Sequence, residues 1–549
     1  MKRYNFINNV MGWVAFLVAA VTYILTTEAS ASFWDCGEFI STADKLLVGH
    51  PPGAPLFMII ARMFAIAAPD VTLVAKFINI MSALASAFTI LFLFWTITHL
   101  ARKIAIDGHV SEAGAEPEPW RVWAVMGAGM VGALAYTFSD TFWFSAVEGE
   151  VYGMSSFFTA IVFWCILKWE NVADEPHANR WIILIAYLMG LSIGVHLLNL
   201  LCIPAIGLVY YFRKYEATPR GVIAALAISC VILGVILYGI IPGLVKIAGY
   251  FDLFFVNDLG LGLNSGAIFW MLLLVAGLIW GLIFTLRRGK ALANTILAAV
   301  AVIILGYSSF AMVVIRSAAN PTMDQNSPDN VFALIDYLNR EQYGDRPLFY
   351  GQTFASPLDR RASQQEEGAP VYMVKDGKYV EVERKPVYKY QASVLFPRMY
   401  SSQQSHIDQY KAWSHFHGTK VQVEGEDGER QVVTIPTFAE NLRFFFAYQI
   451  NFMYLRYFLW NFCGRQNDIQ GHGELTHGNW ITGIAPIDIW MLGDQSLLPD
   501  SLKENKGHNT YFMLPLLLGL AGLFFHAGRQ KRDFWIVMLL FFMTGLAIV

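Results

Sequence analysis

Six clusters of lysine and arginine lie between the long apolar runs of this chain, and one threading through a membrane puts all six on the same side. The clusters are Lys2-Arg3, Arg102-Lys103, Lys168 with Arg180, Arg213-Lys214 with Arg220, Arg287-Arg288 with Lys290, and Arg529 with Lys531-Arg532. Cytoplasmic loops of membrane proteins collect such residues. The pattern therefore predicts a polytopic membrane protein with a cytoplasmic N-terminus, and the threading identifies which acidic residues face outward.

The composition agrees with a membrane protein. Hydrophobic residues make up 56% of the 549 residues and charged residues only 15%, whereas a soluble domain normally carries about 25% charged residues. The net charge of -3 argues against a nucleic-acid partner, which usually needs a basic face. Five cysteines without a CxxC spacing argue against a zinc ribbon or a disulfide framework. On the threading Cys36 and Cys463 face outward and could form one bridge, although nothing requires it.

A spanning helix needs about 20 mostly apolar residues, and eleven runs are predicted to span. They cover about 8–27, 74–100, 121–139, 151–168, 181–197, 199–213, 220–242, 267–286, 291–314, 510–527 and 533–549. The fifth and sixth runs are short and predict a re-entrant segment around His196 and Asn199. The short run from Ala54 to Ala68 predicts an interfacial helix. The first run could instead be a cleaved signal peptide, but the acidic loop after it favours a retained helix.

Residues 316–440 are richer in polar residues than the rest of the chain, and the threading places them outside. The pattern predicts a helix over 330–340 and short strands over 347–350, 371–374 with 378–382, and 421–423 with 431–435. Turns are predicted at Asp376-Gly377 and at Glu426-Asp427-Gly428. The chain is thus predicted to be an all-α membrane protein with a small α/β soluble insert on the outer face.

Three parts follow from this reading: a transmembrane module over 1–315, the insert over 316–440, and a C-terminal part over 441–549. Asn441 to Trp460 is aromatic-rich and is predicted to be an interfacial helix on the outer surface, since counting it as a span would put Arg529 outside. The last apolar run stops at Val549 without a polar flank. This predicts that the natural chain continues beyond that residue.

The first outward loop concentrates chemistry-bearing residues. It reads Phe33-Trp34-Asp35-Cys36-Gly37-Glu38-Phe39 and continues to His50-Pro51-Pro52-Gly53. Asp35 and Glu38 would share one face of a helix, and a carboxylate beside aromatic residues at the membrane surface is a candidate base or ligand. The alternative is that these acids only cap a helix and face solvent.

The second outward loop contains Glu148 and Glu150 just before the fourth span, and Glu150 is the stronger candidate for a site residue. Asp140 could simply cap the helix that follows it. His196 and Asn199 are polar residues at membrane depth, where such groups are often functional, although a helix-to-helix hydrogen bond would also explain them.

Outward arginines near the bilayer are not explained by topology. Arg316, Arg443, Arg456 and Arg465 are of this kind, and arginine binds phosphate bidentately. A lipid phosphate is therefore a plausible partner, while contact with anionic headgroups is the simpler alternative. The tract from Gly464 to Glu474 has metal-like residue types but no zinc signature. No metal site is predicted; a divalent metal is disfavoured but not excluded, and no nucleotide-binding motif appears.

Taken together, these motifs resemble a known superfamily. The acidic first outer loop, Gly49-His50-Pro51-Pro52-Gly53, and Phe142-Trp143-Phe144-Ser145 to Glu150-Val151-Tyr152 resemble the GT-C glycosyltransferases. More narrowly, they are similar to a bacterial family, formerly of unknown function, that is related to transmembrane-protein-260-type protein O-mannosyltransferases. The resemblance covers most of 1–315 and the tract 441–490.

The resemblance implies a transferase in the bacterial inner membrane with a periplasmic active site. It would move a mannose-like sugar, with inversion, from a polyprenyl-phosphate donor to a hydroxyl acceptor, Ser or Thr of exported proteins. Asp35 matches the position of the family's acid and Glu38 is second; both are predicted to be catalytic. His50, Glu150, His196 and Asn199 are predicted to bind substrate. Arg316 and Arg456 are carried over from the family as phosphate-binding arginines.

Two other classes of protein remain open on the sequence. A lipid or solute transporter or flippase would often show inverted repeats and a midplane site, whereas this chain has no evident repeat and its acids cluster outside the membrane. A non-catalytic scaffold of an envelope complex would use the insert as a docking module. Membrane lipids are expected partners in every case.

Overall fold

The computed structural model describes residues 2–107, 117–344, 346–425 and 429–548. The chain forms two compact units that are interleaved in sequence. Unit 1 comprises Met1–Phe255, Asn264–Arg340 and Leu517–Ile548, and unit 2 comprises Val256–Leu263, Glu341–Leu516 and Val549. The predicted division into 1–315, 316–440 and 441–549 stays a prediction.

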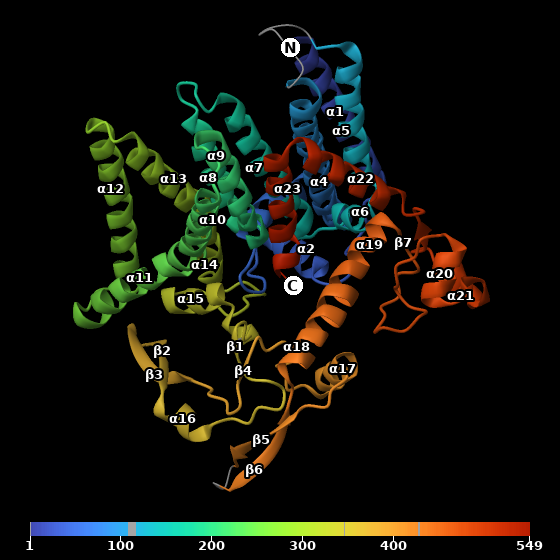
Figure 1. Ribbon diagram of the computed structural model, residues 1–549. Helices are drawn as coiled ribbons and strands as arrows, with labels where there is room; N and C mark the ends of the chain where they lie inside the picture. Colours follow the sequence, from blue (N-terminus) through green and yellow to red (C-terminus); the bar gives the residue numbers. More distant parts are fainter. Residues whose placement is uncertain (1, 108–116, 345, 426–428, 549) are drawn as a thin grey trace. The chain divides into compact units, whose positions relative to one another are not determined.

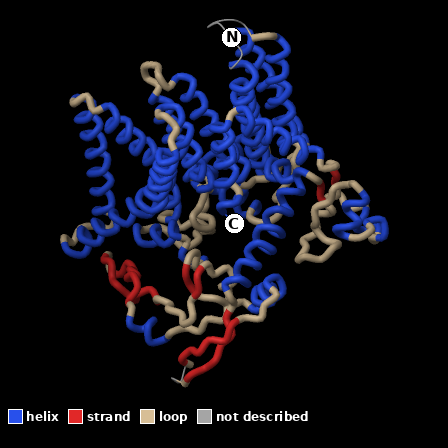
Figure 2. Tube along the Cα trace, in the orientation of Figure 1, coloured by secondary structure: helices blue, strands red, loops and turns tan. Residues whose placement is uncertain are grey.

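Unit 1 is helical (Figures 1 and 2). Its longer helices are α1 (Lys2–Leu25), α4 (Val74–Arg102), α5 (Pro119–Thr137), α7 (Val151–Val172), α8 (Asn179–Ile193), α9 (Ile203–Lys214), α10 (Pro219–Gly234), α11 (Ile241–Leu253), α12 (Ser265–Arg287), α13 (Ala291–Tyr307) and α23 (Lys531–Thr544). Its short helices are α2 (Cys36–Lys45), α3 (Pro55–Ala67), α6 (Asp140–Ala146), α14 (Ala311–Ser317) and α15 (Val331–Asn339). Helix α22 (Leu514–Arg529) begins at the boundary between the units.

Short 3-10 and π segments extend several of these helices. The 3-10 segments are η1 (Val71–Leu73), η3 (Leu197–Cys202), η6 (Ser308–Phe310) and η10 (Leu546–Ile548). The π segments are η2 (Lys103–Asp107), η4 (Val235–Ile240) and η5 (Phe254–Asp258). As a result, one continuous helical run extends over Pro219–Asp258, well beyond the predicted span 220–242.

The chain is a multi-pass membrane protein by the length and composition of its helices. Seven helical runs of the described residues are long and apolar enough to cross a membrane, or eight if α5 and α6, which bend by 68°, are counted as one span. The sequence predicts eleven spans. The three predicted spans over 181–197, 510–527 and 533–549 became α8, α22 and α23, which have 15, 16 and 14 residues. A helix rises only about 1.5 Å per residue, so these three are short for a bilayer.

Glycines allow a close contact between two helices of unit 1. A Cβ added at Gly190 of α8 would lie 2.4 Å from the carbonyl oxygen of Ile303 in α13, and one at Gly306 would lie 2.4 Å from the backbone nitrogen of Leu191. Small residues let helices of membrane proteins approach in this way. At another contact, Lys103 donates to Glu170 of α7 at 2.7 Å and to Asp533 of α23 at 3.0 Å, which joins the C-terminal helix to the rest of the unit.

All described strands lie in unit 2 and form four two-stranded antiparallel sheets. They pair as β1 (Tyr350–Gly351) with β4 (Val394–Leu395), β2 (Glu367–Lys375) with β3 (Lys378–Pro386), β5 (Thr419–Glu424) with β6 (Arg430–Ile435), and β7 (Gly464–Arg465) with β8 (Asn509–Thr510). The helices of unit 2 are η7 (Glu341–Tyr343), α16 (Arg360–Gln365), α17 (Gln404–Ser414), α18 (Phe438–Phe444), η8 (Phe445–Leu455), α19 (Arg456–Phe462), α20 (Ala485–Leu492), η9 (Gln495–Leu497) and α21 (Asp500–Lys503). The predicted small α/β region is therefore confirmed.

Local turn chemistry placed the first hairpin correctly. Lys375 pairs with Lys378, and the two residues between them, Asp376 and Gly377, have φ of 52° and 75°. Such left-handed pairs suit Asp-Gly in a two-residue hairpin turn. The predicted turn at 426–428 lies outside the described residues. The predicted helix over 330–340 is α15, which begins where the side chain of Asn330 accepts hydrogen bonds from the backbone of Phe332 and Ala333.

Candidate functional site

A cavity of about 260 Å³ opens in unit 1 between the loop after α1 and the start of α7. Its acidic, histidine and arginine lining residues are Asp35, Glu38, His50, Glu150, His196 and Arg340. Five of these six were predicted from the sequence, and the six together come from four separate segments of the chain. The volume is close to the lower end of the roughly 300–1,000 Å³ typical of small-molecule sites, which suits a ligand of about one sugar residue.

The carboxylate of Asp35 has no hydrogen bond or ion pair with any described residue. Asp35 directly precedes α2, and its carbonyl oxygen accepts the hydrogen bond of Phe39 N at 2.9 Å. Its side chain makes no capping hydrogen bond, so helix capping does not explain this acid. The side chain is exposed in the cavity wall, next to Trp34, which is 85% exposed. The structure thus leaves a carboxylate available to a ligand.

Glu38 and His50 form a pair within the same wall. Glu38 Oε1 accepts from the backbone N–H of His50 at 2.7 Å and lies 3.0 Å from His50 Nδ1. Gln325 Nε2 donates to the same oxygen at 3.3 Å. The hydrogen bond with His50 lowers the pKa of Glu38, and the same contact raises the pKa of His50 above its ordinary value. The pair therefore favours an imidazolium beside an ionised carboxylate.

The loop that carries His50 is shaped by close backbone contacts. A Cβ at Gly49 would lie 2.8 Å from Glu38 Oε1, so a side chain there would have to displace the Glu38 carboxylate. The hydroxyl of Tyr337 in α15 donates to the Gly49 carbonyl at 2.8 Å. On the other side, Val48 N donates to the Met323 carbonyl at 3.1 Å. Segments nearly 290 residues apart in sequence thus hold His50 in place.

Glu150 is the most perturbed acid of the cavity. It is only 5% exposed and caps α7, because its Oε2 accepts the hydrogen bond of Val151 N at 2.8 Å. Burial raises its pKa to about 7, and the negative charges of Glu148 and Asp35 add to the shift. A carboxyl group with a pKa near neutrality can give or take a proton at working pH. Perturbed acids of this kind cluster at functional sites.

Glu148 has a different place. It is also 5% exposed, but it does not line the cavity; Cys36 Sγ donates to its Oε2 at 3.4 Å. Burial raises the pKa of both groups. Together with the hydrogen bond from Glu28 N to the Val147 carbonyl at 3.0 Å, this contact ties the first acidic loop to the second. All five cysteines are free thiols, so the bridge considered between Cys36 and Cys463 is not formed.

Three of the predicted site residues do not line the cavity. Asn199 is fully buried among helices, with its Nδ2 3.5 Å from Met189 Sδ. Arg316 donates to the carbonyl of Leu46 at 2.6 Å, so it fixes the end of α2. Arg456 belongs to unit 2, where it donates to the carbonyls of Phe452 and Gly478 and lies 4.0 Å from the centre of the Phe452 ring. By contrast, His196 lines the cavity, and its ring centre lies 5.8 Å from that of Tyr152.

Arg340 is the cavity residue that sequence reasoning missed. It follows α15 in a left-handed conformation, with φ of 59°, and it contributes the guanidinium of the cavity wall. Burial lowers the pKa of His196, and the charge of Arg340 lowers it further. The sequence assigned Arg340 to the soluble insert, and its only signal was its place at the end of the predicted helix. In the described part of the chain, no three His, Cys, Asp or Glu side chains are grouped so that they could hold a metal ion.

Two family models match separate parts of the chain. Residues 35–219 match the protein O-mannosyl-transferase TMEM260 N-terminal domain, and residues 344–446 match a family of unknown function, DUF8416. The first match covers every cavity residue up to His196. It confirms the resemblance predicted from the acidic loops, since the acidic residues of both loops lie within it.

Curated relatives share the same part of the chain. The protein O-mannosyl-transferase tmem260 of Dictyostelium discoideum is 27% identical over 190 residues, 34% of this chain and 20% of that protein. The protein O-mannosyl-transferase TMEM260 of Mus musculus is 27% identical over 178 residues, 32% of this chain and 22% of that protein. The alignments thus span about a fifth of each relative's length. No solved structure matches the chain significantly.

Proposed function

We propose that this chain, whose residues 35–219 are related to the N-terminal domain of TMEM260-type protein O-mannosyltransferases, is a membrane glycosyltransferase. It moves a mannose-like sugar from a polyprenyl-phosphate donor to a hydroxyl group, that of Ser or Thr in exported proteins. The observation that carries the proposal is the unpaired carboxylate of Asp35 in a cavity that also contains Glu150, His50 and Arg340. Asp35 can take a proton, and Arg340 and protonated His50 can hold an anion.

The residues divide the reaction between them. The acceptor oxygen attacks the anomeric carbon, the bond from that carbon to the phosphate oxygen breaks, and polyprenyl phosphate leaves with the electron pair. Asp35 takes the proton of the acceptor hydroxyl; a positioned base of this kind typically contributes about 10²–10⁴-fold in rate. A single in-line displacement inverts the anomeric carbon. The sugar enters the cavity while the lipid chain stays in the bilayer.

The leaving phosphate needs positive charge. Arg340 and the imidazolium of His50 both line the cavity, and cations placed where negative charge develops lower the barrier. Glu38 favours the protonated form of His50 through the contact at 3.0 Å and acts on the reaction through it. We therefore assign the phosphate-binding role to Arg340 in place of Arg316 and Arg456, whose guanidinium groups bind backbone carbonyls.

Glu150 is the second candidate for the base. Its pKa of about 7 matches a group that accepts a proton near neutral pH, whereas its partial protonation would let it donate to a sugar hydroxyl. We keep Asp35 as the base because no described residue pairs with its carboxylate, while Glu150 Oε2 is held by Val151 N at 2.8 Å. If Asp35 is the base, Asp35→Asn should lose transfer, whereas if Glu150 is the base, Glu150→Gln should lose it.

The threading gives the transferase its orientation. We propose a GT-C-like arrangement in a bacterial inner membrane, with the N-terminus in the cytoplasm and the Asp35 cavity open to the periplasm. The basic clusters support this orientation. Because successive spans end on alternate sides of the membrane, we also propose that the strands of unit 2 lie in the periplasm. Eleven passes would require that α8, α22 and α23 cross the membrane although they are short.

Sugar transfer from a defined donor tests the function. Membranes that contain the full chain are incubated with a polyprenyl phosphate carrying a radiolabelled mannose and with a Ser/Thr-rich peptide. The expected result is label in the peptide that resists organic extraction. Label that stays in the lipid fraction, but changes sides in sealed vesicles, would instead identify a flippase.

A further inference from the structure

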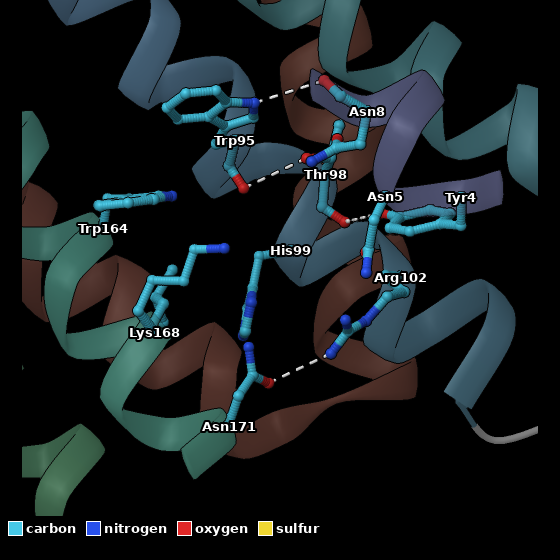
Figure 3. A pocket seen from close by; sticks show the side chains of 11 residues that line it. Tyr4, Asn5, Asn8, Trp95, Thr98, His99, Arg102, Trp164, Lys168 and Asn171 are labelled. Carbon is cyan, nitrogen blue, oxygen red and sulfur yellow. Dashed lines mark hydrogen bonds between the residues drawn. The ribbon is translucent and has the colours of Figure 1, made fainter. Parts of the chain in front are cut away.

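A second cavity lies at the other end of the helices that lead to the Asp35 cavity. It has a volume of about 40 Å³ and is lined by residues of α1, α4 and α7 (Figure 3). On α7 it involves Lys168 and Asn171, whereas Glu150 caps the opposite end of that helix. A separation of 18 residues corresponds to roughly 27 Å along a helix. The two cavities therefore lie at opposite ends of the same helix bundle.

The charge of this second cavity is positive. Lys168 and Arg102 line it, and none of the described aspartates and glutamates does. Lys168 Nζ lies 5.1 Å from the centre of the Trp164 ring and has no ion pair or hydrogen bond with any described residue. Arg102 donates to Asn171 Oδ1 at 3.2 Å and to Asp107 at 3.3 Å. Among the described residues, no carboxylate balances the charge of this lysine.

Tryptophan side chains indicate where this cavity lies relative to the membrane surface. Trp95 and Trp164 both line it and stack with ring centres 5.5 Å apart and an interplanar angle of 29°. Trp181 packs edge-on against Trp164 at 6.1 Å. Tryptophan is enriched where a membrane protein crosses the lipid–water interface. The Lys2-Arg3 cluster begins the same helix that supplies Asn5 and Asn8. Both observations place the cavity at headgroup level.

One polar atom of the cavity lacks a partner. Asn8 Oδ1 is buried and accepts no hydrogen bond from the described residues. A buried acceptor without a donor costs free energy, so a bound hydroxyl would satisfy it. The cavity therefore combines cations, which suit a phosphate, with an acceptor, which suits a hydroxyl group next to that phosphate.

We propose that this cavity binds the phosphate of an anionic phospholipid with a hydroxyl-bearing headgroup, such as a phosphatidylglycerol, in the leaflet opposite the Asp35 cavity. Basic pockets between membrane helices bind anionic headgroups, and a volume of about 40 Å³ holds a phosphate-sized group but not a sugar. Lys168 and Arg102 bind the phosphate, and Asn8 accepts from the headgroup hydroxyl. The bound lipid holds α1, α4 and α7 together. This site is independent of the transferase proposal.

Lipid-dependent thermal stability of the purified full chain in detergent tests the site. Phosphatidylglycerol, phosphatidylcholine and inorganic phosphate are titrated in separate arms. The expected result is a rise in unfolding temperature that saturates with phosphatidylglycerol only. Equal rises with both lipids would overturn the proposal, and a rise with inorganic phosphate alone would show that the source is free phosphate and not lipid.

Variants and salt make the test specific. In Lys168→Gln, the phosphatidylglycerol concentration that gives half of the rise in unfolding temperature is expected to increase about fivefold, the change for one charge near an anionic surface. Lys168→Arg should leave that concentration unchanged. The matched control is Arg220→Gln, which removes an exposed charge of α10 outside the cavity. If Lys168→Gln does not fold, the wild-type titration at raised salt decides. Screening should weaken the effect, and a salt-independent effect would overturn the proposal.

Discussion

Glu38 Oε1 accepts the backbone N–H of His50 at 2.7 Å and lies 3.0 Å from the Nδ1 atom of the same residue. This double contact changes the role expected for Glu38. A carboxylate engaged in this way orients and charges its histidine, whereas the unpaired Asp35 stays available for the acceptor. The two acids of the first loop, three residues apart, are therefore predicted to act differently.

Asp35→Asn tests the base. The change keeps the size of the side chain but removes its ability to take a proton, so transfer should fall by at least about 10²-fold while donor binding persists. The measurement is radiolabelled transfer at saturating donor. Because Asp35 makes no capping hydrogen bond, a helix-stability effect is not expected. Near-wild-type transfer would end the catalytic role of Asp35, though not the transferase proposal.

Glu38→Gln tests the positioning role. The amide can still accept a hydrogen bond, but the pKa of His50, which Glu38 raises, should fall. Since His50 loses its charge as pH rises through its pKa, donor affinity should fall at a lower pH in the variant than in wild type. Donor binding measured between pH 5 and 8 checks this. Glu175→Gln, at an exposed acid outside the cavity, is the control; identical profiles would contradict the prediction.

Arg340→Gln tests the phosphate contact. Loss of one charge-assisted hydrogen-bonding group should raise the KM for donor about tenfold or more, and Arg340→Lys should recover only part of it. The comparison is Arg316→Gln, which removes the contact with the Leu46 carbonyl and should lower thermal stability with little change in donor KM. The opposite pattern in the two variants would restore Arg316 as the donor-binding residue.

Glu150→Gln tests the raised pKa. The folded protein favours protonated Glu150. The contribution of this group to the free energy of unfolding is therefore fully present below its ordinary pKa of 4.5 and is lost as the pH rises through about 7. A shift of this size corresponds to about 3 kcal/mol. Glutamine mimics the protonated form. The unfolding temperature of the variant minus that of wild type should therefore grow from pH 5 to pH 8, and a pH-independent difference would refute the shift.

Single-cysteine labelling tests the orientation. In a background without Cys230, the exposed cysteine, a cysteine at Gly377 in the β2–β3 turn should react with an impermeant maleimide in intact spheroplasts. A cysteine at Gly289, between α12 and α13, should react only after the membrane is opened. Both glycines have positive φ and open space at the Cβ position. The reverse labelling pattern would invert the threading.

The sequence by itself determined what depends on neighbours along the chain. Apolar length and basic loops predicted the positions of the helices, Asn330 marked the start of α15, and Asp376-Gly377 fixed the β2–β3 turn. The acidic loops were found because their residue types stand out in an apolar chain. These signals are local: hydrophobic period, capping and turn conformation involve residues only a few positions apart.

Only the tertiary structure decided which side chains share a cavity. Arg340 lines the Asp35 cavity and Arg316 does not, because α15 packs on the Gly49–His50 loop through Tyr337. Asn199 is buried among helices, while its neighbour His196 is in the cavity wall. The second cavity joins Asn8, Arg102 and Lys168, which the sequence could assign only to one side of the membrane. Such groupings depend on how helices pack across long separations in sequence, and no local pattern encodes that packing.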